Sequence, residues 1–235
     1  ETRVWRGVRW GTFSQTSRFA LLRDQPSGAA GRSRRGGASG GSQGGGGSAS
    51  SEKGSDAILV ELATGRSQFL GSVGDAEFNR AGTMLAYTVA TEDQDANGLF
   101  VMELATGRTQ ALDNDARIYS QLAWNDAGSG IAVLKGEAVE KMLERDNTLL
   151  VVPDVAAAME DPSLGPKTLT ASAPGFPQGW VISHRASLTW SEDGSRVFLG
   201  AKPQIPASDT VPVESSDSTT NVDIWNTADR YLQSV

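Results

Sequence analysis

The sequence contains an internal repeat, and a repeat of this kind restricts the folds that remain possible. Three segments, at 78–87, 124–133 and 190–199, share an aromatic residue, three mostly polar residues, a glycine, a serine or threonine, and an apolar run. A looser copy begins at Phe13. The first two aromatic residues, Phe78 and Trp124, are 46 residues apart. This spacing matches the roughly 40–50 residues of one β-propeller blade.

A second element alternates with the first along the chain. The residues Leu-Ala-Thr-Gly-Arg occur at 62–66 and again at 104–108, which places the two copies 42 residues apart. Glycine adopts a positive φ without steric cost, so Thr64-Gly65 and Thr106-Gly107 are predicted to form tight turns. The glycines of the first element, at 82, 128 and 194, are predicted to close β-hairpins for the same reason.

The runs between these turns are short and rich in Val, Leu, Ile and aromatic residues, which favours strands over helices. The predicted strands lie at 19–23, 57–61, 84–89, 99–103, 131–134, 148–152 and 196–201. We therefore expect an all-β fold, a partial β-propeller of about three to four four-stranded antiparallel blades. A β-sandwich is the alternative, but a sandwich does not require the same aromatic-to-glycine module three times.

The aromatic residues that open the modules are predicted to wedge between adjacent blades. Each of Phe78, Trp124 and Trp190 would bury roughly 150–250 Å² there. Truncation of one of them to alanine would then destabilise the protein by about 3–5 kcal/mol.

We expect residues 1–235 to form one partial β-propeller domain with interruptions. A Gly/Ser-rich stretch at 27–55 cannot pack a core and is predicted to be a disordered loop within a hairpin; a domain linker or an engineered scar is the alternative. A polar stretch at 203–221 is predicted to be a long surface loop. The charged stretch at 136–146 is predicted to form one or two exposed helical turns. Trp124 and Trp190 are 66 residues apart, which indicates a blade with an insertion.

Composition excludes several classes of protein. The net charge of −7 opposes binding to nucleic acid, whose affinity for proteins comes mainly from Lys and Arg. With zero cysteines there is neither a disulfide framework nor a thiolate metal site. No apolar stretch reaches the roughly 18 residues of a membrane span. The chain begins at Glu1 and is expected to be cut from a longer protein.

The sequence offers no catalytic, cofactor-binding or metal-binding residue. Nucleophilic hydrolysis needs a serine in a Gly-x-Ser-x-Gly pentapeptide on a sharp strand-to-helix turn, and we expect this motif to be absent from the chain. The single histidine, His184, is predicted to lie at a strand end or on the surface. Residues 93–98 begin like a calcium-binding loop, but Leu104 stands where the bidentate Glu is required, so a polar hairpin turn is predicted. Three arginines at 32, 34 and 35 lack the aromatic neighbours of nucleic-acid-binding tracts.

The repeated Leu-Ala-Thr-Gly-Arg turns, residues 190–196 (WSEDGSR) and residues 222–235 (VDIWNTADRYLQSV) carry a family resemblance. They resemble the amino-terminal β-propeller of prolyl oligopeptidase-family serine peptidases, above all the large bacterial members. The resemblance covers most of the chain outside the Gly/Ser-rich stretch, and 222–235 is its most specific part. The modules also resemble translocation-associated periplasmic propellers.

The resemblance implies a non-catalytic propeller that gates and supports a downstream α/β-hydrolase domain of the same parent chain and admits peptide substrates to it. The catalytic Ser, Asp and His would belong to that domain. Glu137, Glu140 and Glu144 are too widely spaced to match the adjacent glutamates with which dipeptidyl-peptidase relatives hold a substrate's amino terminus. The alternative function is a stand-alone periplasmic protein-binding propeller of the translocation-associated type. A periplasmic or secreted location is expected in preference to a cytoplasmic one.

Overall fold

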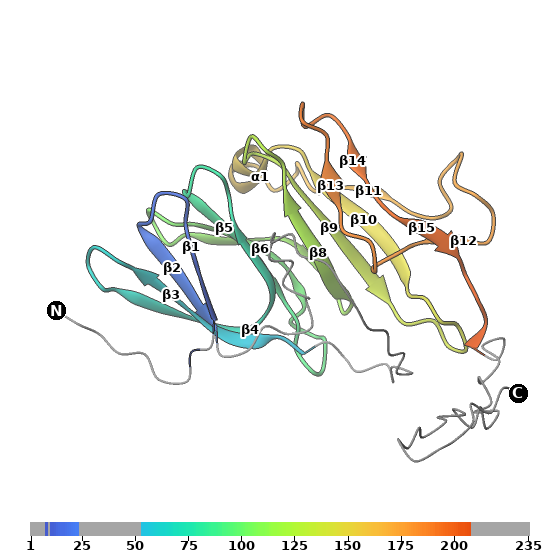
Figure 1. Cartoon of the computed structure of the whole chain (residues 1–235), viewed down its shortest axis with the longest axis horizontal. Helices are drawn as coiled ribbons and strands as arrows, with labels where there is room; N and C mark the ends of the chain where they lie inside the picture. Colours follow the sequence, from blue (N-terminus) through green and yellow to red (C-terminus); the bar gives the residue numbers. More distant parts are fainter. Residues whose placement is uncertain (1–7, 9, 24–52, 208–235) are drawn as a thin grey trace, which may run out of the picture.

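The computed structural model describes residues 8, 10–23 and 53–207, and these residues are organised almost entirely as β-strands (Figure 1). The strands are β1 (Trp10–Phe13), β2 (Phe19–Arg23), β3 (Ser55–Glu61), β4 (Ser67–Phe78), β5 (Met84–Val89), β6 (Gly98–Glu103), β7 (Thr109–Asn114), β8 (Ile118–Trp124), β9 (Ile131–Glu137), β10 (Asp146–Val152), β11 (Lys167–Leu169), β12 (Trp180–Ile182), β13 (Thr189–Trp190), β14 (Val197–Phe198) and β15 (Ala201–Pro203). The one described helix is α1 (Val155–Glu160). No described helix has the length and apolarity that a bilayer crossing requires.

Strand β4 links two four-stranded units into one sheet. The seven strands β1 to β7 pair antiparallel in chain order. The first part of β4 pairs with β3 and its last part pairs with β5, and the register shifts between Val73 and Ala76. The 12-residue β4 is therefore the outer strand of one unit and the first strand of the next.

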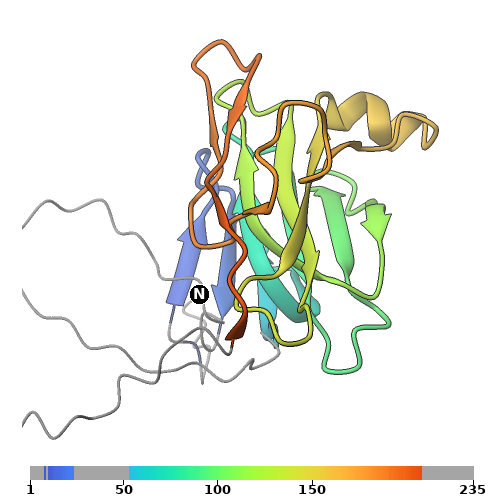
Figure 2. The same cartoon turned by 90° about the vertical axis from the view of Figure 1, so that its right-hand side faces the viewer.

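The second half of the described chain repeats this plan and then becomes irregular. Strands β8 to β11 form a four-stranded antiparallel sheet in chain order. The strand pairs β12 with β15 and β13 with β14 follow as two small sheets. Figure 1 shows the sheets succeeding one another across the molecule, and Figure 2 shows α1 projecting from one side of them.

The apolar core lies between successive units. One cluster joins residues of β2, β3 and β4 to residues of β5 and β6. A second joins β5 and β6 to β8, β9, β10 and α1, and a third joins β9 and β10 to Ile182 and Leu188. Sheets that pack face to face in sequence in this way form a β-propeller, so the predicted all-β propeller class is confirmed. The number of blades stays a prediction.

The hairpin turns that open the units stack on one another. Gly82, Gly128 and Gly194 have φ angles of 64°, 70° and 67°, as predicted for tight turns. A Cβ atom placed on Gly82 would lie 3.4 Å from Cβ of Ser14. The equivalent distances are 3.5 Å from Gly128 to Asn79 and 4.0 Å from Gly194 to Asn125. Each turn thus contacts the corresponding turn of the unit before it.

A polar residue just after the module aromatic holds each turn closed. The Oδ1 atom of Asn79 accepts hydrogen bonds from the main-chain N–H groups of Thr83 (2.9 Å) and Met84 (3.0 Å). Asn125 accepts in the same way from the two residues that follow its turn glycine. Ser14 and Ser191 have the same role in the first and last copies, each with one main-chain donor. Side-chain acceptors thereby replace main-chain partners that the turn cannot supply.

The module aromatics join neighbouring units, as predicted, but they are only partly buried. Phe78, Trp124 and Trp190 pack at the edges of the three core clusters. The aromatic of the looser copy, Phe13, is 62% exposed. Since half-buried rings lose less on truncation than core rings do, the expected cost of 3–5 kcal/mol is too high for these positions.

Two local predictions were wrong. The stretch 136–146 forms no helix: Lys141 has a φ of 60°, and Met142 pairs with Pro206 through an isolated β-bridge. The run predicted as one strand at 196–201 is split into β14 and β15. The predicted loops at 27–55 and 203–221 lie mostly outside the described residues, and β3 already begins at Ser55.

Candidate functional site

The first strands of three successive units border an open groove of about 520 Å³, here called the inner groove. It is lined by Thr12, Phe13, Gln15, Ala76, Glu77, Phe78, Asn79, Arg80, Trp124, Asn125 and Asp126. These residues belong to the ends of β1, β4 and β8 and to the turns that follow them. Because the turns stack, the repeat itself gathers side chains that lie far apart in the sequence.

Glu77 is the acidic side chain contributed by β4 to the inner groove. Desolvation by the surrounding protein raises its pKa, a main-chain hydrogen bond with Trp124 lowers it, and the nearby Asp75 raises it further. The Nε1–H of Trp124 donates to the main-chain oxygen of Glu77 at 3.0 Å, which holds the indole against β4 where both residues line the inner groove. A carboxyl group beside aromatic rings can accept hydrogen bonds from an ammonium or amide group while the rings pack against apolar side chains.

A second polar cluster surrounds Glu144, whose side chain is 2% exposed. Its Oε1 lies 2.8 Å from Nζ of Lys202 and 3.3 Å from Nε of Arg185. Burial raises the pKa of Glu144, but the Lys202 hydrogen bond and the charges of Arg185, Lys202 and His184 outweigh it and lower the pKa. The main chain of Glu144 is held from both sides by the side-chain amide of Gln204. Sequence reasoning missed this cluster because its members come from three separate segments of the chain.

His184 lies two residues beyond the end of β12, so its predicted place at a strand end is confirmed. Its side chain is 20% exposed, and Nδ1 lies 3.8 Å from Oε2 of Glu144. The main-chain oxygen of His184 accepts a hydrogen bond from Nε2 of Gln121 at 2.7 Å. The histidine is therefore part of the Glu144 cluster.

The other glutamates of 136–146 are separated by the structure. Glu137 ends β9, where its carboxylate lies 3.1 Å from Arg117. Glu140 is exposed and lies 3.6 Å from Nζ of Lys141. The two carboxylates and that of Glu144 thus have different partners.

Residues 93–98 connect the antiparallel strands β5 and β6, so the predicted polar hairpin turn is confirmed. Asn97 is 1% exposed and organises this turn. Its Oδ1 accepts from the N–H of Thr91 at 2.7 Å, and its Nδ2 donates to the main-chain oxygen of Arg117 at 2.8 Å. In the described part of the chain, no group of three His, Cys, Asp or Glu side chains is placed to hold a metal ion.

Several residues singled out in the sequence lie outside the described residues. These are the arginines at 32, 34 and 35 and the segment 222–235. The expectation that the chain contains no Gly-x-Ser-x-Gly pentapeptide was wrong, because the Gly/Ser-rich stretch contains this spacing at 37–41 and at 40–44. These two segments also lie outside the described residues, and the expectation of no catalytic residue stays a prediction.

Comparison with protein-family models and with curated proteins finds no match. Solved structures do match. Dipeptidyl peptidase 4 of Porphyromonas gingivalis aligns with a TM-score of 0.55 and 8% identity over 86% of this chain and 31% of that one. The β-propeller domain of the trilobed protease of Pyrococcus furiosus aligns with a TM-score of 0.41 and 12% identity over 65% of this chain and 48% of that one. TolB of Acinetobacter baumannii aligns with a TM-score of 0.42 and 12% identity over 83% of this chain and 38% of that one.

The chain spans less than half the length of each of these proteins. It has the fold of a β-propeller. The structures similar to it include propeller-containing peptidases of the prolyl oligopeptidase family and TolB propellers.

Proposed function

We propose that this chain is the non-catalytic gating and scaffolding propeller region of a serine peptidase. A downstream α/β-hydrolase domain of the same parent chain supplies the catalytic Ser, Asp and His. The propeller acts by steric exclusion and by orienting peptide substrates for that domain. The resemblance of residues 190–196 and 222–235 to such peptidases supports the proposal, and the inner groove is the observation that carries it.

The inner groove has the dimensions and chemistry to hold an extended peptide segment. A volume of about 520 Å³ accommodates a few residues and excludes a folded domain. Glu77 accepts hydrogen bonds from the peptide's ammonium or amide groups, while Phe78 and Trp124 pack against its side chains. Arg80, whose guanidinium lies 3.5 Å from the main-chain oxygen of Asp126, borders the groove.

The experiment measures binding and hydrolysis by the purified 235-residue chain. A fluorescent oligopeptide with a free amino terminus is expected to bind without being cleaved. Glu77→Gln is expected to weaken binding by roughly three- to tenfold, because it removes a charged acceptor. The matched control, Glu192→Gln, changes an exposed glutamate outside the inner groove and should leave affinity unchanged.

Turnover of a chromogenic peptide ester by this chain would contradict the proposal. In that event Ser39→Ala and Ser42→Ala would test whether the Gly-x-Ser-x-Gly pentapeptides supply the nucleophile.

The alternative, a stand-alone propeller that binds protein partners, differs in what the reading frame encodes after Val235. Further blades followed by a Gly-x-Ser-x-Gly motif between a strand and a helix support the peptidase proposal. A stop codon soon after the propeller supports the alternative and overturns the proposal.

A further inference from the structure

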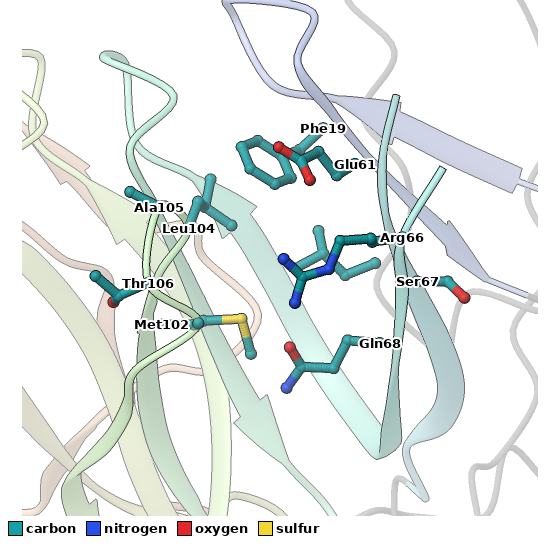
Figure 3. A pocket seen from close by; sticks show the side chains of 11 residues that line it. Phe19, Glu61, Arg66, Ser67, Gln68, Met102, Leu104, Ala105 and Thr106 are labelled. Atoms are coloured by element: carbon teal, nitrogen blue, oxygen red, sulfur yellow. The ribbon is translucent and has the colours of Figure 1, made fainter. Parts of the chain in front are cut away.

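A second groove, here called the rim groove, opens between the β3–β4 and β6–β7 turns and has a volume of about 340 Å³ (Figure 3). Its floor is apolar and is formed by Phe19, Leu59, Met102 and Leu104, none of them more than 7% exposed. Polar residues of the β3–β4 turn border it. Figure 3 shows the side chains of Arg66 and Gln68 directed across the groove toward Met102.

The rim groove is built on the better preserved of the two repeated elements. Residues 61–68 read ELATGRSQ and residues 103–110 read ELATGRTQ. The two turns have the same internal bonds, since Thr64 and Thr106 each donate to the carboxylate three residues earlier at 2.6 Å. Arg66 and Gln68 therefore occupy, on their unit, the places that Arg108 and Gln110 occupy on the next one.

The second copy of the element holds a helix. Nη1 of Arg108 lies 2.8 Å from the carboxylate of Glu160, and Nη2 donates to the main-chain oxygen of Met159. Nε2 of Gln110 donates to the main-chain oxygen of Ala158 at 3.2 Å. All three acceptors lie in the last turn of α1, where main-chain oxygens lack partners within the helix.

The apolar face of α1 fills the space beneath these bonds. Val155, Ala158 and Met159 belong to the core cluster between β5–β6 and β9–β10. The cavity that remains beside the helix measures about 30 Å³. At the second copy, the chain itself thus supplies both the apolar filling and the acidic partner.

The rim groove occupies, beside the first copy of the element, the position that α1 occupies beside the second copy, but none of the described residues forms a helix there. The connection between β6 and β7 is the short turn 104–108, whereas the connection between β10 and β11 spans 153–166 and includes α1. Within the described part of the chain, the guanidinium of Arg66 has no ion-pair partner. The guanidinium of Arg66 and the amide of Gln68 are consequently left exposed above a buried apolar floor, at a place where their repeat counterparts bind a helix.

We infer that the rim groove docks a short helical segment of a partner protein that has the chemistry of α1. This segment carries apolar residues at positions equivalent to Val155, Ala158 and Met159 and a carboxylate after them. Arg66 binds the carboxylate and a terminal main-chain oxygen, Gln68 binds the preceding oxygen, and the apolar side chains cover the groove floor. The inference concerns a different surface from the inner groove and does not rest on the proposed peptidase function.

The test uses a labelled, acetylated peptide of residues 153–161 (PDVAAAMED) and the 235-residue chain, with binding followed by fluorescence anisotropy. Saturable binding is expected. Arg66→Ala should weaken it by roughly 10- to 100-fold, the range for a hydrogen bond to a charged group. Ala105→Trp, which fills the groove from an exposed position, should abolish it.

Two controls separate docking from misfolding and from general charge attraction. Arg196→Ala removes another exposed arginine, outside the rim groove, and should leave the affinity unchanged. Circular dichroism should show that every variant is folded. A peptide with Glu160→Gln should bind weakly to the unmodified chain and lose little more on Arg66→Ala, because the two groups form one interaction. Absence of saturable binding, or equal effects of Arg66→Ala and Arg196→Ala, would overturn the inference.

Discussion

Trp190 donates its indole Nε1–H to the main-chain oxygen of Ala123 at 3.1 Å, across the boundary between two units of the fold. Trp124 makes the equivalent bond to Glu77 at 3.0 Å. In both cases the acceptor is the residue just before the aromatic of the preceding unit. The bond is therefore part of the repeat and links each unit to its neighbour.

Trp190→Phe should lower the free energy of unfolding by about 1 kcal/mol, because it removes this donor and keeps most of the packed ring. Urea denaturation followed by circular dichroism measures the change. Trp180→Phe is the matched control, since Trp180 is 39% exposed and its indole has no hydrogen bond within the described residues. Equal stability losses in the two variants would show that the inter-unit bond contributes nothing.

Asn79→Ala should be more harmful than either tryptophan change, with a loss of about 2–4 kcal/mol. Asn79 is 4% exposed, and its removal leaves the N–H groups of Thr83 and Met84 without their acceptor. Asn79→Asp keeps the acceptor but loses the Nδ2 donor to the oxygen of Gly128, so an intermediate loss is expected in chemical denaturation. If Asn79→Asp were as unstable as Asn79→Ala, the turn would depend on the bond to Gly128 instead.

Glu144→Gln should destabilise the protein by about 1–3 kcal/mol at pH 7, because Lys202, Arg185 and His184 face its carboxylate. Its pKa in the folded protein is lowered from the ordinary 4.5, so folding favours the ionised form. The contribution is fully present above that ordinary value and is lost as the pH falls through the folded pKa. The stability gap between the native chain and Glu144→Gln should therefore narrow below about pH 4.5.

Denaturant unfolding of both proteins, measured at about one pH value per pH unit between pH 3 and pH 7, tests this dependence. The exposed Glu140→Gln serves as control and should show no gap at any pH. If the stability difference between the native chain and Glu144→Gln stayed constant down to pH 3, the ionised carboxylate of Glu144 would not be the source of the stabilisation.

The sequence predicted the repeated parts of the fold well. Residues 84–89 form β5 as expected, and the turn glycines at 82, 128 and 194 all have positive φ. These features are local, since each depends on a few neighbouring residues and a steric rule. The stretch 136–146 was mispredicted because its helix-permissive composition is outweighed by tertiary contacts, namely the bridge of Met142 to Pro206 and the burial of Glu144.

The candidate sites were less accessible from the sequence. Glu77 enters the inner groove because it immediately precedes a module aromatic, a signal that alignment of the copies could have revealed. The rim groove was recognised by comparing the spaces beside the two Leu-Ala-Thr-Gly-Arg turns. Only the structure shows that α1 fills the space beside the second turn and that no helix of the described chain fills the space beside the first. The Glu144 cluster has no sequence signal, because Lys202 lies 58 residues from its carboxylate partner.

The stacking of successive turns is the central structural claim, and a disulfide between two of them tests it most directly. A Cβ placed on Gly128 would lie 3.4 Å from Cβ of Arg80, close to the roughly 3.5–4.5 Å of a disulfide. Because the chain contains zero cysteines, the double variant Arg80→Cys, Gly128→Cys has no competing thiol. Mild oxidation and mass spectrometry should find this pair bonded, and the pair Arg80→Cys, Gly194→Cys, two units apart, still reduced. If the pair at 80 and 128 stayed reduced while the pair at 80 and 194 formed a disulfide, the stacking of successive turns would be contradicted.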